Sequence, residues 1–328
     1  MEGNIPKRVF VTGGAGFIGS HICDRLVEMG TEVVCADNLI TGSTENISHL
    51  MGKENFEFIE CDITEINSCM EAMDGCDAIN HQAALGSVPR SVADPLKTNL
   101  YNITGTLNIF HTAATKNIKR VVFASSSSVY GDEEGLPKIE GKIGAQLSPY
   151  AVSKRAGELY SAVFNKIHGI ETIGLRYFNI FGPRQTPEGV YAAVIPRFIN
   201  NTLNGERSAI YGDGGQSRDF TYVSNAVDAN IAALTTDKEA AFGRIYNIAC
   251  GSRMTLNEIF EQIRDIIGEV DPEVAEITPI FEEERVGDVR HSLADISLAK
   301  EYLNYEPIID SRRGLSLTVQ SHISSQWQ

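Results

Sequence analysis

The first half of the chain alternates between short apolar runs and segments whose apolar residues recur at helical spacing. Residues 8–12 form the first run, and Ile22, Leu26 and Met29 follow a helical period after a glycine-rich turn. Later runs of strand length cover residues 31–36, 56–60, 78–82 and 121–124, and a long helix is expected over 95–117. Strands separated by helices form right-handed crossovers, so the pattern predicts an α/β fold with a parallel sheet.

The turn after the first strand carries three evenly spaced glycines. Gly13 permits a tight turn, Gly16 lets the backbone approach a pyrophosphate at the helix N-terminus, and Gly19 allows close packing of the helix on the strand. The next strand ends in Asp37, at the distance expected for a carboxylate that binds a ribose 2′-hydroxyl. Because this carboxylate repels a 2′-phosphate, the stretch predicts a doubly wound, Rossmann-like sheet that binds NAD rather than NADP.

Composition and charge narrow the class of protein. The 328 residues are too many for one simple core, so one large or two modest domains are expected. The net charge of −15 argues against nucleic acid as a partner, and no apolar run reaches membrane-spanning length. The six cysteines form no C-x-x-C pair, and the first strand begins too early to leave room for a signal peptide. We therefore expect a cytoplasmic protein with free thiols, no metal site and no membrane partner.

A second set of polar residues suits proton transfer. Residues 125–128 are four serines directly after a predicted strand, and Tyr150 and Lys154 lie four apart on one face of a helix that Pro149 can begin. A phenol titrates near 10, but a lysine one turn away, together with a nicotinamide ring, stabilises the phenolate and lowers that pKa. In isolation each stretch is typical of an ordinary turn or helix, yet together they indicate a dehydrogenase-type catalytic set.

With these residues the chain resembles the extended short-chain dehydrogenase/reductases from end to end. Within them it is similar to the UDP-sugar 4-epimerases, most closely to the UDP-N-acetylglucosamine 4-epimerases of surface-polysaccharide pathways. The stretches that carry the resemblance are residues 12–19, 81–91, 125–131, 150–154, 175–182, 191–197, 212–220 and 284–292. The first and fourth occur throughout the superfamily, whereas the second and the last three are specific to the epimerases.

The resemblance implies two domains and a dimer. Residues 1–180 are expected to form an NAD-binding Rossmann domain, to which a segment of about 217–248 returns. Residues 181–216 and 249–328 are expected to form a smaller C-terminal α/β domain that binds the UDP-sugar. The family also implies a homodimer in which the helices around 95–117 and 150–168 build a four-helix interface.

The resemblance also implies the site residues. The catalytic residues are expected to be Ser126, Tyr150 and Lys154. The cofactor-binding residues are expected to be Gly13, Gly16, Phe17, Ile18, Asp37, Asn38, Asp62, Ile63, Gln82, Ala83, Ala84, Tyr150, Lys154 and Tyr177. The substrate-binding residues are expected to be Gly86, Ser87, Ser126, Ser127, Tyr150, Asn179, Val194, Tyr211, Arg218, Arg285, Asp288 and Ser292. Among them Arg218 and Arg285 suit a pyrophosphate, and Tyr211 can stack on uracil.

The expected reaction is 4-epimerisation of UDP-N-acetylglucosamine and UDP-N-acetylgalactosamine. It proceeds by transient oxidation of C4, rotation of the 4-keto sugar and re-reduction, with Tyr150 as the base and Ser126 on the same oxygen. Related dehydratases carry an Asp-Glu pair where this chain has Ser127 and Ser128, and UDP-glucuronate decarboxylases also usually keep a carboxylate there. The alternatives that stay open are a glucose/galactose or glucuronate 4-epimerase and a catalytically inactive NAD-binding regulatory protein.

One small residue bears on the sugar. In the related epimerases the position three residues after the Val of the G-D-V stretch borders the C2 substituent, and here it is Ser292. A tyrosine ring would occupy the volume of an acetamido group, and overpacking costs about 1–3 kcal/mol. Ser292 also suits a simple turn. The loop at residues 86–90 independently resembles that of the N-acetyl epimerases, so the N-acetylated pair is favoured.

Overall fold

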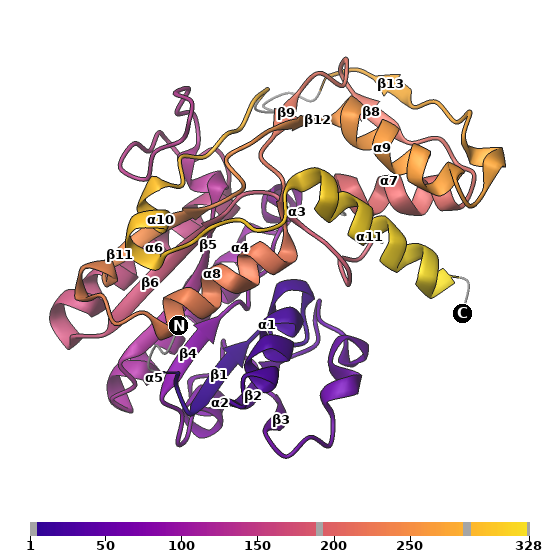
Figure 1. The fold of residues 1–328 in the computed structure, drawn as a ribbon. Helices are drawn as coiled ribbons and strands as arrows, with labels where there is room; N and C mark the ends of the chain where they lie inside the picture. Colours follow the sequence, from indigo (N-terminus) through magenta and orange to yellow (C-terminus); the bar gives the residue numbers. More distant parts are fainter. Residues whose placement is uncertain (1–4, 188–192, 285–289, 327–328) are drawn as a thin grey trace.

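A seven-stranded parallel sheet organises the molecule (Figure 1). The computed structural model describes residues 5–187, 193–284 and 290–326. The strand order is β11-β6-β5-β4-β1-β2-β3, and every neighbouring pair is parallel. The strands are β1 (Arg8–Thr12), β2 (Glu32–Asp37), β3 (Phe56–Glu60), β4 (Ala78–His81), β5 (Arg120–Ser126), β6 (Glu171–Tyr177) and β11 (Arg244–Ile248). The predicted α/β class and Rossmann-like sheet are confirmed, with strand ends within a few residues of those expected.

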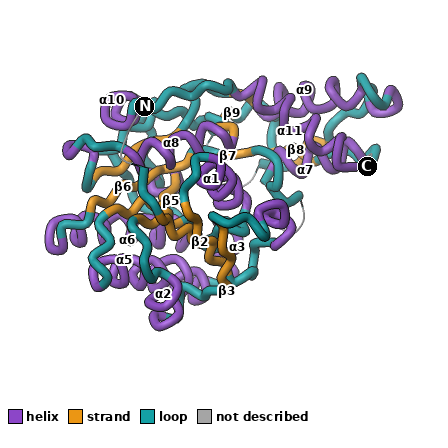
Figure 2. The backbone as a smooth tube through the Cα atoms, turned by 60° about the horizontal axis from the view of Figure 1, so that its bottom comes forward, coloured by secondary structure: helices purple, strands orange, loops and turns teal. Residues whose placement is uncertain are grey.

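Helices cover both faces of the sheet (Figure 2). The helices α1 (Phe17–Glu28) and α8 (Val223–Thr235) share one buried core with the sheet. The helices α2 (Ile66–Ala72), α5 (Thr106–Thr115) and α6 (Pro149–His168) share a second core on the other face. The central strands read as nearly continuous apolar runs because both of their faces are buried. This arrangement leaves only the strand ends for polar ligands.

The long helix expected over 95–117 is interrupted by a different helical geometry. It runs as α4 (Pro95–Asn99), a π-helical turn (Leu100–Gly105) and then α5, after the short helix α3 (Val88–Ala93). The π turn places Asn102 against two other segments. Its side chain accepts from the Leu85 amide at 2.7 Å and donates to the Leu85 carbonyl at 3.1 Å and to Ser153 Oγ at 3.0 Å. Such turns are often found at functional sites, and this one ties a cavity loop to α6.

A smaller unit has a core of its own. The helices α7 (Val194–Leu203), α9 (Leu256–Gly268) and α11 (Ser311–Gln326) contribute to it Phe198, Phe260, Ile263, Leu315 and Val319. Short strand pairs complete it, with β8 (Ala209–Tyr211) beside β13 (Ile280–Glu282) and β9 (Ser217–Arg218) beside β12 (Met254–Thr255).

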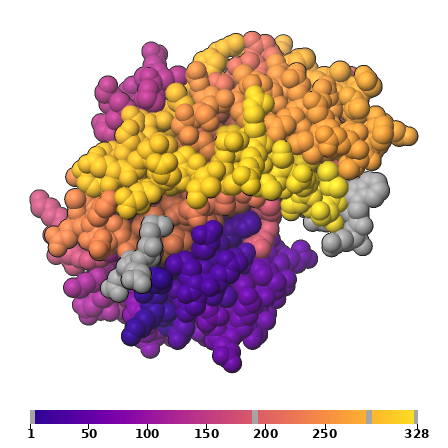
Figure 3. Space-filling view, in the orientation of Figure 1, coloured from indigo at the N-terminus to yellow at the C-terminus, as the bar shows by residue number. Residues whose placement is uncertain are grey.

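The chain passes between the two parts more than once. It leaves the sheet after β6, and β7 (Ile180–Phe181) pairs with β10 (Thr221–Tyr222) where it comes back toward α8 and β11. The helix α10 (Ser297–Leu303) packs on α8 and β11, although it lies late in the chain. Figure 3 shows the C-terminal segment in yellow lying across one face, above the indigo N-terminal part. The domain boundaries given above stay a prediction. Within the described residues, no helix is long and apolar enough to span a membrane.

Candidate active site

The larger of two described cavities, about 550 Å³, opens at the carboxyl ends of the central strands. Most of the predicted cofactor residues line it, and they are Gly13, Gly16, Phe17, Ile18, Asp37, Asn38, Ile63, Gln82, Ala83, Ala84, Tyr150, Lys154 and Tyr177. The predicted substrate residues Gly86 and Ser87 line it as well. Asp62 lies just behind the wall, where it accepts hydrogen bonds from Asn38 at 3.0 Å and Tyr101 at 3.2 Å. The structure therefore brings together residues that are more than a hundred positions apart in the chain.

The glycine-rich turn forms a cradle that has no room for side chains. Gly13 has a φ of +65°, and a Cβ added there would lie 2.7 Å from the Ala83 nitrogen. A Cβ at Gly19 would lie 2.0 Å from the Gly13 carbonyl oxygen. No side chain caps the start of α1 after Gly16, so the first-turn N–H groups are available to an anion. This cradle fits the pyrophosphate of NAD.

Asp37 lies in the same cavity beside the cradle. Its two carboxylate oxygens accept hydrogen bonds from the Ala15 amide at 3.1 Å and the Leu39 amide at 2.8 Å. Burial raises the pKa of this carboxyl, and the backbone donors oppose the rise. The lone pairs that remain can accept ribose hydroxyls, whereas a 2′-phosphate would meet a buried negative charge. The residues present thus fit NAD and disfavour NADP.

The predicted catalytic residues meet where β5 ends and α6 begins. Ser126 is the last residue of β5, and Tyr150 and Lys154 lie in the first turns of α6, which the Ser148 side chain caps by accepting from the Ala151 amide at 3.1 Å. Lys154 Nζ donates to the Ala124 carbonyl at 2.9 Å and lies 6.0 Å from the centre of the Tyr150 ring. Tyr150 and Lys154 line the cavity at this corner, and Ser126 contacts Tyr150 there without being among the described lining residues.

The pKa of Tyr150 differs from the expectation that Lys154 would lower it. Burial raises the pKa of Tyr150, and the hydrogen bond with Ser126 opposes the rise without reversing it. Burial also lowers the pKa of Lys154 to about 8, so its charge is easily lost. The expected lowering of the phenol pKa relied on a nicotinamide ring in addition to Lys154. In this structure desolvation of the buried phenol outweighs the Ser126 hydrogen bond.

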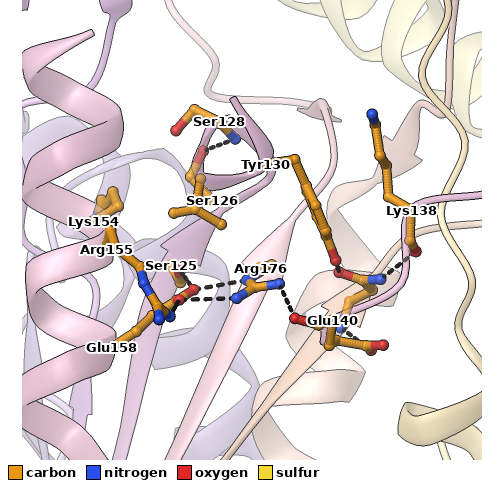
Figure 4. A network of polar contacts seen from close by, with 12 residues as sticks. Ser125, Ser126, Ser128, Tyr130, Lys138, Glu140, Lys154, Arg155, Glu158 and Arg176 are labelled. Atoms are coloured by element: carbon orange, nitrogen blue, oxygen red, sulfur yellow. Dashed lines mark hydrogen bonds and ion pairs between the residues drawn. The ribbon is translucent and has the colours of Figure 1, made fainter. Parts of the chain in front are cut away.

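A buried ionic network stands directly behind these residues (Figure 4). Glu158, one turn after Lys154 on α6, accepts two hydrogen bonds from Arg176 of β6 at 2.7 and 2.9 Å, and both side chains are 1% exposed. Ser125 Oγ donates to the same carboxylate at 2.6 Å, and Arg155 donates to it at 2.8 Å. Burial would raise the pKa of Glu158, but the Arg176 contacts outweigh it and lower that pKa. Strand β5, strand β6 and helix α6 are thereby joined through one carboxylate.

The network extends from Arg176 to residues that lie far apart in the sequence. The guanidinium of Arg176 lies 4.9 Å from the centre of the Tyr130 ring, and it donates to the Glu140 carbonyl at 3.0 Å. Tyr130 donates to Asn247 Oδ1 at 2.6 Å, and the Asn247 amide in turn donates to the Lys138 and Asp295 carbonyls, each at 2.9 Å. Sequence reasoning missed these residues. The only signal was a charged residue, Arg176, inside an apolar strand.

Two further clusters of hydrogen-bonded polar side chains lie at the wall of the larger cavity. The Tyr177 hydroxyl donates to Gln82 at 3.0 Å and accepts from Asn230 of α8 at 2.7 Å. His81 lies between Thr12 at 2.7 Å and Thr106 at 2.9 Å, and burial lowers its pKa to about 3, so its ring is neutral. These contacts fix the ends of β1, β4 and β6 relative to one another, and sequence reasoning missed Asn230 and Thr106.

A smaller cavity of about 200 Å³ lies in the second unit. Four predicted substrate residues line it, namely Asn179, Val194, Tyr211 and Arg218. Asn179 has a φ of +40°, and Ser87 in the larger cavity has a φ of +97°. Such values are costly for residues other than glycine and are concentrated at functional sites. The Asn179 amide donates to the Asp219 carbonyl at 2.9 Å, which leaves its second N–H for a ligand.

The remaining predicted residues are placed as follows. Ser127 begins the short turn directly after Ser126. The Ser292 amide donates to the Ser217 carbonyl at 3.0 Å, beside Arg218, and Ser292 is not among the described residues that line either cavity. Arg285 and Asp288 lie outside the described residues.

Comparison with known proteins bears on what these cavities bind. The model of the NAD dependent epimerase/dehydratase family matches residues 9–249. A UDP-glucose 4-epimerase of Mycolicibacterium smegmatis is 34% identical over 315 residues, covering 95% of this chain and 97% of that protein.

Solved structures agree with this match over nearly the whole chain. The UDP-N-acetylglucosamine 4-epimerase of Methanobrevibacter ruminantium, in complex with UDP-N-acetylmuramic acid, is 42% identical with a TM-score of 0.90, covering 97% of this chain and 99% of that one. The UDP-glucuronic acid 4-epimerase of Bacillus cereus, in complex with UDP-glucuronic acid and NAD, is 31% identical with a TM-score of 0.87 and the same coverage. This chain belongs to the NAD dependent epimerase/dehydratase family and, within it, is a UDP-sugar 4-epimerase that uses NAD.

Proposed function

We propose that the protein interconverts UDP-N-acetylglucosamine and UDP-N-acetylgalactosamine. The observation that carries this choice of sugar is the 42% identity to a UDP-N-acetylglucosamine 4-epimerase, higher than that of the UDP-glucose and UDP-glucuronate enzymes described above. The resemblance adds a steric argument through the small side chain of Ser292 and the loop that begins at Gly86. A Cβ added at Gly86 would meet no atom within 4 Å, so the backbone there leaves open space beside the cavity.

In this proposal Tyr150 is the general base and acid for the C4 hydroxyl. The Tyr150 phenolate accepts that proton during oxidation and returns it after the 4-keto sugar has turned, while Ser126 hydrogen-bonds the same oxygen. Lys154 sets the charge beside the phenol and is held by the Ala124 carbonyl. Bound NAD supplies the hydride acceptor for C4 and the hydride that restores it. Since the sugar leaves with no net change of redox state, no second substrate is needed.

In this proposal the two cavities bind different parts of the UDP-sugar. Asn179, Val194, Tyr211 and Arg218 hold the uridine diphosphate, because these residues line the smaller cavity. Gly86 and Ser87 approach the sugar from the wall of the larger cavity, next to Tyr150. Arg285 and Asp288 complete the set as the resemblance implies.

A side-by-side assay tests the choice of sugar. UDP-GlcNAc, UDP-GalNAc, UDP-Glc, UDP-Gal and UDP-GlcA are incubated separately with the purified protein, without added cofactor, and the products are separated by chromatography. We expect the N-acetylated pair to give the highest kcat/KM, with weaker activity on UDP-Glc and UDP-Gal. A strong preference for UDP-Glc or UDP-GlcA would replace this function by the corresponding epimerase. Binding of NAD with no turnover of any sugar would indicate a regulatory protein.

The Ser292→Tyr variant tests the steric argument itself. The added ring should suppress turnover of both N-acetylated sugars and spare UDP-Glc and UDP-Gal, because only the acetamido group needs that volume. Ser297→Ala, at the start of α10, is a control that removes a nearby serine without adding bulk. Full activity of the Tyr variant on UDP-GlcNAc would show that Ser292 does not border the sugar.

We also propose a homodimer through α3, α4 and α6. Exposed apolar side chains recur every four residues along α3, α4 and the start of the π turn, at Val88, Val92, Leu96 and Leu100, and Leu96 is 82% exposed. A second stripe on α6 comprises Val152, Leu159, Val163 and Ile167. The helices pack on one another, so the stripes form one apolar face of the kind that pairs with a copy of itself.

Light scattering after size-exclusion chromatography tests the dimer. The wild-type protein should elute with twice the mass of one chain, and Leu96→Glu together with Leu159→Glu should give the single-chain mass. Ile308→Glu changes an equally exposed apolar residue elsewhere and should leave the mass unchanged. A monomeric wild type would refute this interface.

A further inference from the structure

The smaller cavity contains an arginine whose side chain has no partner among the residues that the structure describes. Arg197 lies in the second turn of α7 and lines this cavity together with Arg218. Its side chain is only partly exposed, yet it makes no hydrogen bond or ion pair with any described residue. By contrast, eight other arginines that are half-buried or buried each have such a contact with a described residue, namely Arg8, Arg25, Arg120, Arg155, Arg176, Arg184, Arg218 and Arg264. A partly buried guanidinium without a partner is costly, and an anion bound beside it would offset that cost.

The cavity wall has the charge that an anion requires. Its described lining residues include two arginines and no aspartate or glutamate, in a chain whose net charge is −15. The other polar residues of the wall are Asn179, Tyr211 and Gln216. The position of Arg197 near the N-terminal end of α7 adds to the argument, because the helix dipole disfavours a cation there unless an anion lies close by. Local positive charge of this kind, in an acidic protein, indicates a specific anionic ligand rather than general electrostatic attraction.

We propose that Arg197 binds the diphosphate of the nucleotide-sugar, together with Arg218. The proposal rests on the UDP-sugar function only in that the ligand is a nucleoside diphosphate. The guanidinium offers a planar fork of donors that matches two phosphate oxygens, and Arg218 supplies a second fork from β9. Arg218 Nη1 already donates to the Ser217 carbonyl at 3.1 Å and to the Arg290 carbonyl at 3.0 Å, so Arg218 is held in place. Arg197 has no such contact among the described residues, so its side chain can turn onto the ligand.

The role differs from that of a sugar-specific residue. A contact to the diphosphate is made equally in the ground state and the transition state, so its loss raises KM and leaves kcat unchanged. The increase in KM should be the same for each UDP-sugar that the enzyme accepts. A residue that selected the sugar would instead change the ratio between substrates.

Calorimetric titration of the NAD-loaded protein with UDP and with uridine tests the proposal. Arg197→Gln should weaken UDP binding roughly tenfold or more, the scale of one lost charge-assisted contact, and change uridine binding by less than twofold. Arg218→Gln should weaken UDP binding at least as much. Arg313→Gln replaces an exposed arginine outside the cavity and should bind UDP as the wild type does. The affinity of the Arg197→Gln variant for UDP should also depend less steeply on salt concentration.

Stability separates a binding role from a structural one. Because Arg197 has no partner among the described residues, Arg197→Gln should unfold at the same temperature as the wild type or at a higher one. Unchanged UDP affinity, an equal loss of uridine and UDP affinity, or a clear drop in unfolding temperature would each overturn the proposal. Titration with UDP does not depend on the sugar. A wild type that binds UDP but epimerises another sugar would therefore refute the proposed function and leave this proposal intact.

Discussion

The two cavities are built in different ways. The larger lies at the ends of β1, β2, β4, β5 and β6, and the protein itself already satisfies the charges around it. Glu158 is paired with Arg176, Asp37 accepts two backbone N–H groups, and Lys154 donates to a backbone carbonyl. The smaller lies between α7 and short two-residue or three-residue strands, and its Arg197 lacks any partner among the described residues.

The contrast shows two kinds of site. The larger cavity has its charged groups held in place by the protein, whereas the smaller cavity needs the charge of its ligand. A hydride transfer needs its groups aligned to within a fraction of an ångström, which long strands and a buried ion pair can maintain. Holding a uridine diphosphate needs charge and contact area, and a ligand that arrives with its own charge can complete such a site. We therefore expect damage to the first region to lower kcat and damage to the second to raise KM.

The largest expected effect tests the base in the pre-organised region. Tyr150→Phe should lower kcat by roughly two orders of magnitude or more, the scale of general acid–base catalysis, because the variant lacks the phenol proposed to take the C4 hydroxyl proton. Fluorescence or calorimetric titration should show NAD binding close to that of the wild type. Tyr160→Phe removes a hydroxyl from the same helix, away from the cavity, and should keep normal turnover. Near-normal turnover of Tyr150→Phe would refute the proposed role of Tyr150 as the base. Release of one NADH per catalytic cycle would refute the epimerase mechanism.

The next effect tests whether the buried ion pair maintains that alignment. Glu158→Gln leaves the guanidinium of Arg176 buried without a counter-charge, which costs about 3–5 kcal/mol of folding free energy. Urea unfolding should measure this loss. At temperatures where the variant remains folded, kcat should fall more than KM rises, because Ser125 and α6 share the altered carboxylate.

The double variant Glu158→Gln with Arg176→Met supplies the comparison. Removing both charges should restore much of the stability, since a buried pair is often replaceable by apolar groups. If the double variant also regained full kcat, the pair would stabilise the fold without positioning the catalytic groups.

Local signals made the larger cavity predictable from sequence. The glycine spacing, the strand that ends at Asp37 and the Tyr150–Lys154 pair each encode their geometry within one or two turns of chain, and β2 differs from its predicted range by a single residue at each end. The fold class follows from the same alternation. Such patterns predict well because the backbone conformation depends on neighbouring residues.

Contacts across the fold were not predictable in this way. Nothing near Arg176 in the sequence indicates that Glu158 is its partner, or that Asn247 receives the Tyr130 hydroxyl from 117 positions away. The π turn at Leu100–Gly105 depends on the tertiary bonds of Asn102, so a helical pattern alone predicted an uninterrupted helix. The pattern beyond Leu317 suggested no role, and there α11 buries Val319 in the smaller core.

A third prediction concerns the choice of cofactor in the larger cavity. NAD should bind at least roughly tenfold more tightly than NADP to protein stripped of cofactor, because the 2′-phosphate meets the buried Asp37 carboxylate. Asp37→Asn should narrow the difference by removing the charge while keeping the shape. Titration of both cofactors measures it, and equal affinities in the wild type would contradict the role of Asp37.

The smallest expected effect is on the alkylation rate of a cysteine that lines only the larger cavity. Cys61 lines the larger cavity, and Cys69 lies behind it, fully buried. The neighbouring Cys69 thiol and the Ser68 hydroxyl, which donates to Cys61 Sγ at 3.3 Å, lower the pKa of Cys61, and the proximity of Cys61 raises the pKa of Cys69. Since the thiolate is the reactive form, alkylation of Cys61 should increase with pH and reach its half-maximal rate below the ordinary thiol value of about 8.5.

Bound ligands should then affect this reaction differently. In the proposed arrangement NAD fills the cavity that Cys61 lines and should slow alkylation several-fold, whereas UDP in the smaller cavity should leave the rate nearly unchanged. Mass spectrometry of iodoacetamide-treated protein measures the rate at each cysteine, and Cys61→Ser identifies the labelled position. Cys250 lies outside both cavity walls, so its labelling should not respond to NAD. Protection of Cys61 by UDP alone would mean that the two ligands do not occupy separate regions, and the comparison between a pre-organised cofactor cavity and a ligand-completed nucleotide cavity would fail.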